Sequence, residues 1–167
     1  HVIVGDMDSI DPDTLTFFFK KNVPIQSHPR RKTQTDLELC LTYATEQGAK
    51  KITILGATGT RMDHSLANIL LLLPLAKAGI PARIMDSNNE IQMVTDRLEM
   101  TGTPGDLVSL IPVTPTVRGV TLQGLSYPLE DHTLEMGSTL GISNYFSESW
   151  AQIKIRSGTL LVIRSMD

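Results

Sequence analysis

The sequence predicts an α/β domain followed by an all-β domain, because the pattern of apolar residues changes near its middle. From Val2 to about Met85, short β-branched runs alternate with longer helical patterns, which is typical of β-α-β units and a parallel sheet. After about Asn88 the helical periods disappear, and short apolar runs are separated by Gly, Pro and Asn. We therefore predict a parallel-sheet domain over residues 1–88 and an antiparallel domain over residues 89–167, built as a sandwich or a partly closed barrel.

The expected elements of the first half are short strands and two helices. The strands are Val2–Val4, Pro24–Gln26, Ile52–Leu55 and Ala82–Met85. Thr35 and Glu38 have the spacing of a capping box, so a helix should begin there. A second helix is expected from about Met62 to Ala78, and Pro74 should kink it or end its first part.

The expected strands of the second half are Leu107–Ile111, Gly119–Leu122, Trp150–Ile155 and Thr159–Ile163. Ile153 and Ile155 alternate with Lys154 and Arg156, which predicts one buried and one solvent-exposed face.

Composition and charge exclude several classes of protein. The chain of 167 residues is 41% hydrophobic and 20% charged, as expected of a globular protein. Its net charge of -3 argues against a nucleic-acid partner, which would favour a basic surface. The longest apolar run, Ile69–Leu73, is far shorter than the roughly 20 residues that cross a membrane. We expect no membrane partner and a cytoplasmic location.

Two further features concern the cysteine and the beginning of the chain. Cys40 lies in a helical apolar pattern, so we expect a buried hydrophobic residue rather than a nucleophile. The sequence enters a predicted strand directly after His1, so we expect that an amino-terminal segment is missing.

Polar residues gather where predicted strands stop or helices start, the edge at which doubly wound sheets bind ligands. The first cluster is Gly5-Asp6-Met7-Asp8-Ser9. If Asp6 continues the strand, Asp6 and Asp8 project to the same side, and a cation such as Mg²⁺ would relieve their repulsion. The alternative is that both aspartates only stabilise a turn.

The second cluster, residues 30–36, leads directly into a helix amino terminus, which favours anions. Lys32 could hold a phosphate, Thr35 could cap the helix, and Asp36 could complete a metal site. The alternative is a solvated charge run followed by a good helix cap.

The third cluster, residues 56–64, is a glycine-containing loop between a strand and a helix. Its small residues, including Gly59, would let a nucleotide approach the backbone, and Arg61 could make a forked contact to phosphate. The loop lacks the Gly-Lys-Ser/Thr ending of a P-loop. Asp63 and His64 could be metal ligand, base or supporting residues, while His64 could also be an ordinary helix-start histidine. Together the clusters predict metal-dependent phosphoryl-type chemistry.

Several stretches resemble the successive signatures of the thiamin pyrophosphokinase family. In the first half these are GDMDSI, KTQTDLELCL and GATGTRMDHSLANILLL. In the second half they are GDLVSLIPV, GVTLQGLSYPLED, GSTLGISNYF and SGTLLVIRS. The resemblance implies an α/β nucleotide-binding domain, a β-sandwich thiamin-binding domain, and a homodimer with thiamin between the subunits. It also implies a Mg²⁺-dependent reaction in which thiamin and ATP give thiamin diphosphate and AMP.

The resemblance implies a role for each matching residue. The catalytic residues would be Asp6, Asp8, Asp36 and Asp63, with Asp6, Asp8 and Asp36 as the Mg²⁺ ligands. The ATP-binding residues would be Lys32, Thr35, Gly59, Arg61 and His64, and thiamin would be contacted by Ser143 and Asn144. The alternative for Ser143 and Asn144 is an ordinary turn between strands.

Family members usually carry an earlier β-α portion with an Asp-Gly-Gly stretch, which this sequence lacks. A non-catalytic nucleotide-sensing module that has lost turnover with this portion therefore stays open. A separate alternative is a related diphosphotransferase that acts on a pterin alcohol.

Overall fold

The computed structural model describes residues 1–29, 31 and 33–166. The chain separates into two compact units, His1–Lys50 and Lys51–Asp167. None of the helices in the described residues is long and apolar enough to cross a membrane.

The first unit contains two strands and two helices. In chain order they are β1 (Ile3–Gly5), α1 (Pro12–Lys20), β2 (Ile25–Ser27) and α2 (Asp36–Glu46). β1 and β2 pair in parallel, as the β-α-β pattern predicted. The sequence analysis did not predict α1, although Asp11 and Pro12 mark its start: the Asp11 carboxylate accepts a hydrogen bond from the Thr14 N–H at 2.8 Å, and Pro12 occupies the first turn.

The predicted start of α2 is confirmed. Thr35 is the N-cap, and its hydroxyl oxygen accepts a hydrogen bond from the Glu38 N–H at 3.2 Å. The Glu38 carboxylate accepts a hydrogen bond from the Gln34 side chain at 3.2 Å.

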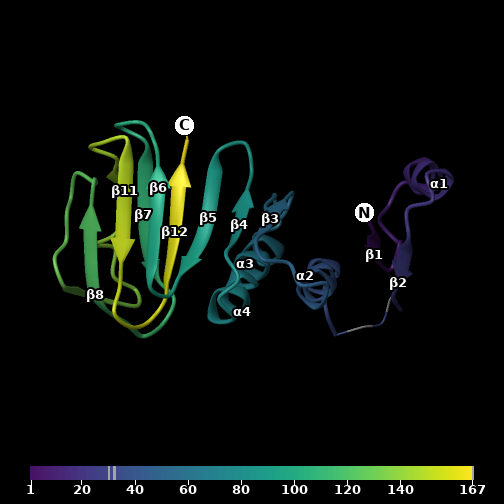
Figure 1. Ribbon diagram of the computed structural model, residues 1–167, viewed down its shortest axis with the longest axis horizontal. Helices are drawn as coiled ribbons and strands as arrows, with labels where there is room; N and C mark the ends of the chain where they lie inside the picture. The colour runs from purple at the N-terminus through teal and green to yellow at the C-terminus, as the bar shows by residue number, and fades with distance from the viewer. Residues whose placement is uncertain (30, 32, 167) are drawn as a thin grey trace. The chain divides into compact units, whose positions relative to one another are not determined.

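The second unit is built on a six-stranded mixed sheet with the order β10-β7-β12-β5-β4-β3 (Figure 1). Its strands are β3 (Ile52–Leu55), β4 (Ala82–Met85), β5 (Asn89–Val94), β7 (Leu107–Pro112), β10 (Asn144–Tyr145) and β12 (Leu160–Ser165). β3 and β4 are parallel, and the remaining neighbours are antiparallel.

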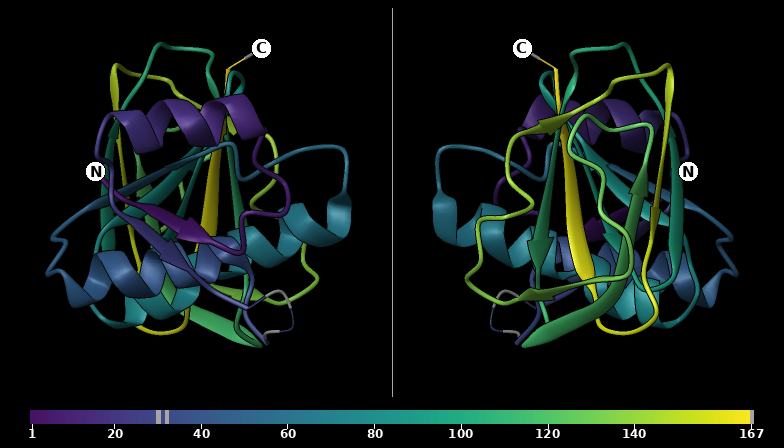
Figure 2. Two further views of the ribbon diagram at one scale, coloured as in Figure 1. Left: turned by 90° about the vertical axis from the view of Figure 1, so that its right-hand side faces the viewer. Right: turned by 90° about the vertical axis from the view of Figure 1, so that its left-hand side faces the viewer.

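Two consecutive helices, α3 (Met62–Leu70) and α4 (Leu72–Lys77), connect β3 to β4 and lie beside the sheet (Figures 1 and 2). They replace the single helix that was expected over residues 62–78. The predicted effect of Pro74 is confirmed, because α3 ends shortly before it and Pro74 has no N–H to donate to the preceding turn.

A second, four-stranded antiparallel sheet has the order β6-β11-β8-β9. Its strands are β6 (Arg97–Thr101), β8 (Thr116–Gln123), β9 (His132–Glu135) and β11 (Trp150–Lys154). Residues of both sheets form one apolar core, in which the largest fully buried side chains include Phe146, Leu110, Leu134, Ile153, Ile155 and Leu160. The predicted alternation is confirmed, because Ile153 and Ile155 are buried while Lys154 and Arg156 are exposed.

The expected separation of parallel and antiparallel strands into different sheets is wrong for the second unit. β4 pairs with β5 in the register Arg83↔Gln92, Ile84↔Ile91 and Met85↔Glu90. The parallel pair β3–β4 is therefore continuous with the antiparallel strands. A tight turn at residues 86–89 reverses the chain directly beside β4, and apolar periodicity does not reveal that pairing. The domain boundary expected at residue 88 stays a prediction.

Candidate active site

The glycine loop, residues 56–61, joins the carboxyl end of β3 to the start of α3 and is fixed by polar side chains of that helix. The buried Ser65 hydroxyl accepts from the Gly59 N–H at 3.0 Å and donates to the Gly59 carbonyl at 3.1 Å. The Asn68 amide donates to the Ala57 carbonyl at 2.8 Å. The loop backbone is therefore held in one conformation before any ligand arrives.

Asp86 fixes the same loop from the carboxyl end of β4. Its Oδ2 accepts from the Thr58 hydroxyl at 2.7 Å, and its Oδ1 accepts from the N–H groups of Asn88 at 2.9 Å and Asn89 at 2.7 Å. The hydrogen bond from Thr58, followed by the one from the Asn88 N–H, lowers the pKa of Asp86 below its ordinary value. Asp86 thus stays ionised and ties the glycine loop to the turn before β5.

The glycine loop leaves room for a ligand. Gly56 has a φ of 71°, a conformation that glycine adopts without steric strain. A Cβ placed on Gly59 would meet nothing within 4 Å, so the space beside its backbone is open. A phosphate chain can therefore approach the loop closely at the carboxyl ends of two parallel strands, where open α/β sheets bind ligands.

Arg61 and Asp63 form a forked ion pair at the start of α3. Arg61 Nε donates to Asp63 Oδ1 at 3.2 Å, and Nη2 donates to Oδ2 at 2.6 Å. The hydrogen bonds from Arg61 and from the His64 N–H lower the pKa of Asp63 to about 2. Both side chains are largely exposed, at 68% and 65%. The pair is therefore accessible to an incoming anion, which would compete with Asp63 for the guanidinium.

In the first unit, the Asp36 carboxylate lies against the end of β1. A Cβ on the buried Gly5 would lie 3.1 Å from Asp36 Cγ, so glycine is what lets the carboxylate approach. This brings Asp36 next to the backbone that leads into Asp6. One turn further along α2, the Cys40 thiol donates to the Val4 carbonyl at 3.7 Å. Burial, with the nearby Asp36 charge, raises the pKa of Cys40, which agrees with the expected apolar role.

The extended geometry considered for Asp6 and Asp8 is not present. β1 ends at Gly5, and Met7 has a φ of 61°. The chain turns so that the Asp8 N–H donates to Asp6 Oδ1 at 3.2 Å. An aspartate side chain that accepts from the backbone two residues later stabilises a turn, which was the alternative reading of this cluster.

Carboxylates of the first unit suit a hard cation. No group of three or more His, Cys, Asp or Glu side chains that could hold a metal occurs among the described residues. Mg²⁺ in kinase-type sites is usually bound through one or two carboxylates together with substrate phosphates. Asp6 and Asp36, whose positions converge at the end of β1, fit that requirement in their chemistry. Lys32 lies outside the described residues.

In the second unit, the residues expected to contact thiamin lie at the start of β10. Ser143 has a φ of 57°, and its N–H donates to the Ser109 hydroxyl at 3.1 Å. The Asn144 side chain is only 4% exposed and is already hydrogen-bonded to Tyr127 and Tyr145. Their contact with thiamin stays a prediction.

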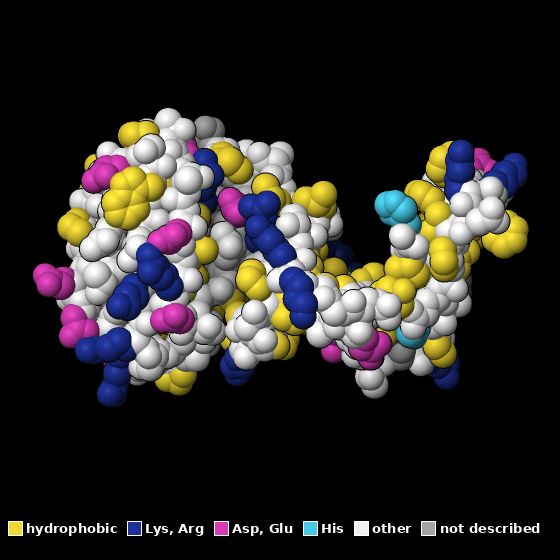
Figure 3. Space-filling model, viewed as in Figure 1, with side chains coloured by type: hydrophobic (Ala, Val, Ile, Leu, Met, Phe, Trp, Pro, Cys, Tyr) yellow, Lys and Arg dark blue, Asp and Glu magenta, His cyan; other side chains and the backbone are white. Residues whose placement is uncertain are grey.

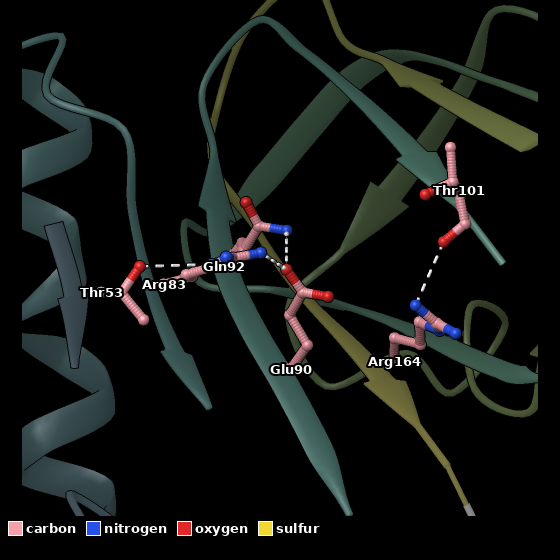
Figure 4. Close-up of polar contacts among 6 residues, drawn as sticks. All are labelled: Thr53, Arg83, Glu90, Gln92, Thr101 and Arg164. Atoms are coloured by element: carbon pink, nitrogen blue, oxygen red, sulfur yellow. Dashed lines mark hydrogen bonds and ion pairs between the residues drawn. The ribbon is translucent and has the colours of Figure 1, made fainter. Parts of the chain in front are cut away.

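A separate hollow of about 330 Å³ lies at the opposite edge of β3 and β4, by the residues that begin these strands. Its two arginines are already hydrogen-bonded (Figure 4): Arg83 donates to the Glu90 carboxylate at 2.8 Å, and Arg164 donates to the backbone carbonyl of Thr101 at 3.1 Å. The glycine-loop edge is therefore the stronger candidate for an active site, because its backbone is open at Gly59 and the Arg61 guanidinium is accessible.

The sequence analysis missed Ser65, Asn68 and Asp86, although each had a signal. Ser65 and Asn68 are three residues apart on α3, which places two polar side chains on the face toward the loop. Asp86 directly follows a predicted strand.

Acidic and basic side chains lie interspersed over the visible face of the sandwich (Figure 3), so phosphate contacts there would have to be local.

Comparison with known proteins covers almost the whole chain. A family model described as "Thiamin pyrophosphokinase, catalytic domain" matches residues 1–84, and one described as "Thiamin pyrophosphokinase, vitamin B1 binding domain" matches residues 90–160. Thiamine pyrophosphokinase of Bacillus subtilis is 35% identical over 98% of this chain and 77% of its own length.

Solved structures agree. The crystal structure of the Bacillus subtilis enzyme matches 98% of this chain and 77% of its own, with a TM-score of 0.89 and 35% identity. The enzyme from Geobacillus thermodenitrificans matches 98% and 76%, with a TM-score of 0.84 and 34% identity. Together with the catalytic-domain match, these findings define a kinase-type enzyme. The chain belongs to the thiamin pyrophosphokinase family.

Replacing Asp86 with Ala should loosen the glycine loop, because Thr58 and the turn before β5 lose their shared acceptor. We expect a loss of roughly 1–2 kcal/mol in urea unfolding at neutral pH. Asp86→Asn, which keeps one acceptor oxygen, should lose less.

The pH dependence of that loss has a definite sign. The pKa of Asp86 is lowered by folding, so its contribution is present above its ordinary value of 3.8 and disappears as the pH falls through the lower folded value. The difference between the wild type and Asp86→Ala should therefore shrink below pH 3.8. An undiminished difference in acid would contradict the role of the carboxylate.

Proposed function

We propose that this chain transfers a diphosphate group from ATP to the hydroxyl of thiamin, giving thiamin diphosphate and AMP, with Mg²⁺ as cofactor. The observation that carries the proposal is the fixed, open glycine loop, which lies within the segment that matches the family's catalytic domain. We also propose the homodimer that the family resemblance implies, and the cytoplasmic location that the sequence analysis expects.

The glycine loop and Arg61 would bind the polyphosphate of ATP. Gly59 offers open space beside its backbone, and the Arg61 fork matches the geometry of phosphate oxygens. Lys32 and Thr35 would contribute from the cluster before α2, and His64 from the first turn of α3. In this proposal ATP displaces Asp63 from Arg61.

Asp6, Asp8 and Asp36 would hold Mg²⁺ together with phosphate oxygens of ATP. When bound, the ion would neutralise charge on the transferred group. The close approach of the Asp36 carboxylate to Gly5 supports the inclusion of Asp36, which is distant in sequence from the other two.

The reaction would follow an in-line displacement. The thiamin hydroxyl oxygen attacks the β-phosphorus of ATP, a new oxygen–phosphorus bond forms, and the bond from the β-phosphorus to the oxygen of the α-phosphate breaks. AMP leaves with that oxygen, and the hydroxyl proton passes to a carboxylate. Most of the acceleration would come from alignment and from cationic groups around the phosphates.

Asp36 or Asp63 would accept the proton. While Arg61 binds Asp63, the pKa of Asp63 near 2 makes it a weak proton acceptor. A phosphate that takes over Arg61 would remove the hydrogen bond that causes this low pKa. Nucleotide binding would thereby raise the basicity of Asp63 at the moment when a base is needed.

The second half would supply the thiamin site, including Ser143 and Asn144. The match of residues 90–160 to a vitamin B1 binding domain supports thiamin over a pterin alcohol as the acceptor.

Incubation with ATP, Mg²⁺ and thiamin tests the reaction directly. We expect AMP and thiamin diphosphate in equal amounts by chromatography, and neither in a control without thiamin. ADP in place of AMP would contradict diphosphate transfer, and binding of ATP without product would instead support a nucleotide-sensing module.

Replacing Asp6 with Asn should reduce turnover roughly a hundredfold or more, because a hard carboxylate ligand becomes a neutral amide. The matched control is Asp13→Asn, which changes an exposed aspartate of α1 in the same unit and should leave turnover unchanged. Circular dichroism checks that both variants fold. Full turnover in Asp6→Asn would refute its role as a metal ligand.

A further inference from the structure

One face of the six-stranded sheet changes from apolar to polar along its width. Val162 of β12 is fully buried in the core between the two sheets, and Gln92 lies opposite it on β5. Gln92 in turn lies opposite Arg83 on β4, and Arg83 lies beside Thr53 on β3. Neighbouring residues of paired strands share a face. The face that packs on the second sheet therefore continues over β5, β4 and β3 with polar side chains.

This polar part of the face borders the hollow of about 330 Å³ at the edge of β3 and β4. The second sheet ends at its edge strand β6, and Glu99, Met100 and Thr101 of that strand also line the hollow. Lys51, which directly precedes β3, completes the lining on the side of the first sheet. The volume falls within the range of sites that bind small molecules.

An ion pair between Arg83 and Glu90 lies in the hollow. Arg83 Nη1 donates to Glu90 Oε1 at 2.8 Å, and the two side chains are only 33% and 13% exposed. Arg83 Nε donates to the Thr53 hydroxyl at 3.3 Å, and Gln92 Nε2 donates to the same Glu90 oxygen at 3.3 Å. Side chains of β3 and β5 therefore fix both charges in position before any ligand arrives.

Each half of this ion pair keeps hydrogen-bonding capacity that the protein does not use. Within the part of the chain that the structure describes, both bonds to Glu90 reach Oε1, and no group donates to Oε2 (Figure 4). Arg83 uses Nε and Nη1 and keeps the N–H groups of Nη2. The exposed Lys51 ammonium pairs with no carboxylate of the described residues. The hollow therefore offers an acceptor and donors close together.

The lining favours a ligand that carries both signs of charge. A simple anion would meet the carboxylates of Glu90 and Glu99, and a simple cation would meet Lys51 and two guanidinium groups. Like charges at short range repel. An α-amino acid carries a carboxylate and an ammonium on the same carbon, so it would place its carboxylate on Arg83 and its ammonium on Glu90 at the same time. A polar side chain on that ligand would suit the remaining polar lining.

We propose that this hollow is a second binding site, which takes a small α-amino acid with a polar side chain. Arg83 and Lys51 bind the carboxylate of the ligand, and Glu90 Oε2 binds its ammonium. The site is distinct from the glycine loop, which lies at the other ends of β3 and β4. It goes beyond the proposed function, which assigns no ligand to this edge of the sheet.

The probe is L-glutamine, which is titrated into the whole chain by isothermal titration calorimetry. Two analogues each lack one charge: glutaramate keeps the carboxylate and the side-chain amide without the ammonium, and L-glutaminamide keeps the ammonium without the carboxylate. We expect L-glutamine to bind with a Kd of about 1 mM or lower, and each analogue to bind roughly tenfold more weakly, because one half of the ion pair loses its partner.

Two variants test the assigned contacts. Lys51→Gln removes the ammonium at the rim, and Glu90→Gln removes the negative charge while keeping an acceptor for Arg83. We expect each to raise the Kd of L-glutamine roughly tenfold. The matched control is Lys50→Gln, which changes the neighbouring exposed lysine outside the hollow and should leave the Kd unchanged. Because Lys51 is exposed, its variant keeps the test decisive even if Glu90→Gln fails to fold.

Three results would overturn the proposal. The first is no binding of L-glutamine by the wild type up to about 10 mM. The second is equally tight binding of glutaramate or L-glutaminamide, which would indicate a site for a simple anion or cation. The third is a Kd that neither variant changes. All three are measured without ATP or thiamin, so failure of this inference is distinguishable from failure of the proposed function.

Discussion

The Asp86 carboxylate connects the glycine loop to the turn before β5 through its hydrogen bonds. One oxygen accepts from Thr58 in the glycine loop, and the other accepts from the turn that starts β5. The turn allows β5 to pair with β4, so the antiparallel strands continue the same sheet as the parallel pair β3–β4. The loop at the carboxyl ends of that pair is thereby anchored to the sandwich core as well as to α3. An ionised carboxylate can serve both roles because it offers several acceptor positions.

Electrostatics in the candidate site are local. The net charge of the chain is -3, yet the loop presents a guanidinium whose partner, Asp63, is exposed and exchangeable. In the proposed function, an incoming phosphate would replace the Asp63 carboxylate as the partner of Arg61. That exchange would couple phosphate binding to the protonation behaviour of Asp63, because the hydrogen bond from Arg61 is the main cause of its low pKa. In the first unit, Gly5 allows the Asp36 carboxylate to approach the end of β1.

Local signals predicted much of the structure, and pairing over long distances accounts for most of what was missed. Strands β3 and β4, the Thr35 cap and the break near Pro74 follow from β-branched runs, capping chemistry and the missing proline N–H. The sequence analysis did not predict β5, β6, β9 and β10. Polar residues in these short strands weaken the alternation of apolar and polar positions that would have revealed them. The turn at Asp6 and Asp8 depends on a positive φ at Met7. A methionine gives no sequence signal for that conformation, whereas a glycine would have. Ser65 and Asn68 bind the backbone of the glycine loop from one face of α3. Their role is therefore evident only in the folded structure, where the loop lies beside that face.

Amide hydrogen exchange across residues 56–64, with and without ATP and Mg²⁺, tests most directly whether the glycine loop binds the nucleotide. The account predicts slower exchange in this segment when ATP is present, and unchanged exchange at the opposite edge of β3 and β4 around Lys51 and Arg83. Protection confined to that opposite edge, with residues 56–64 unaffected, would contradict the account.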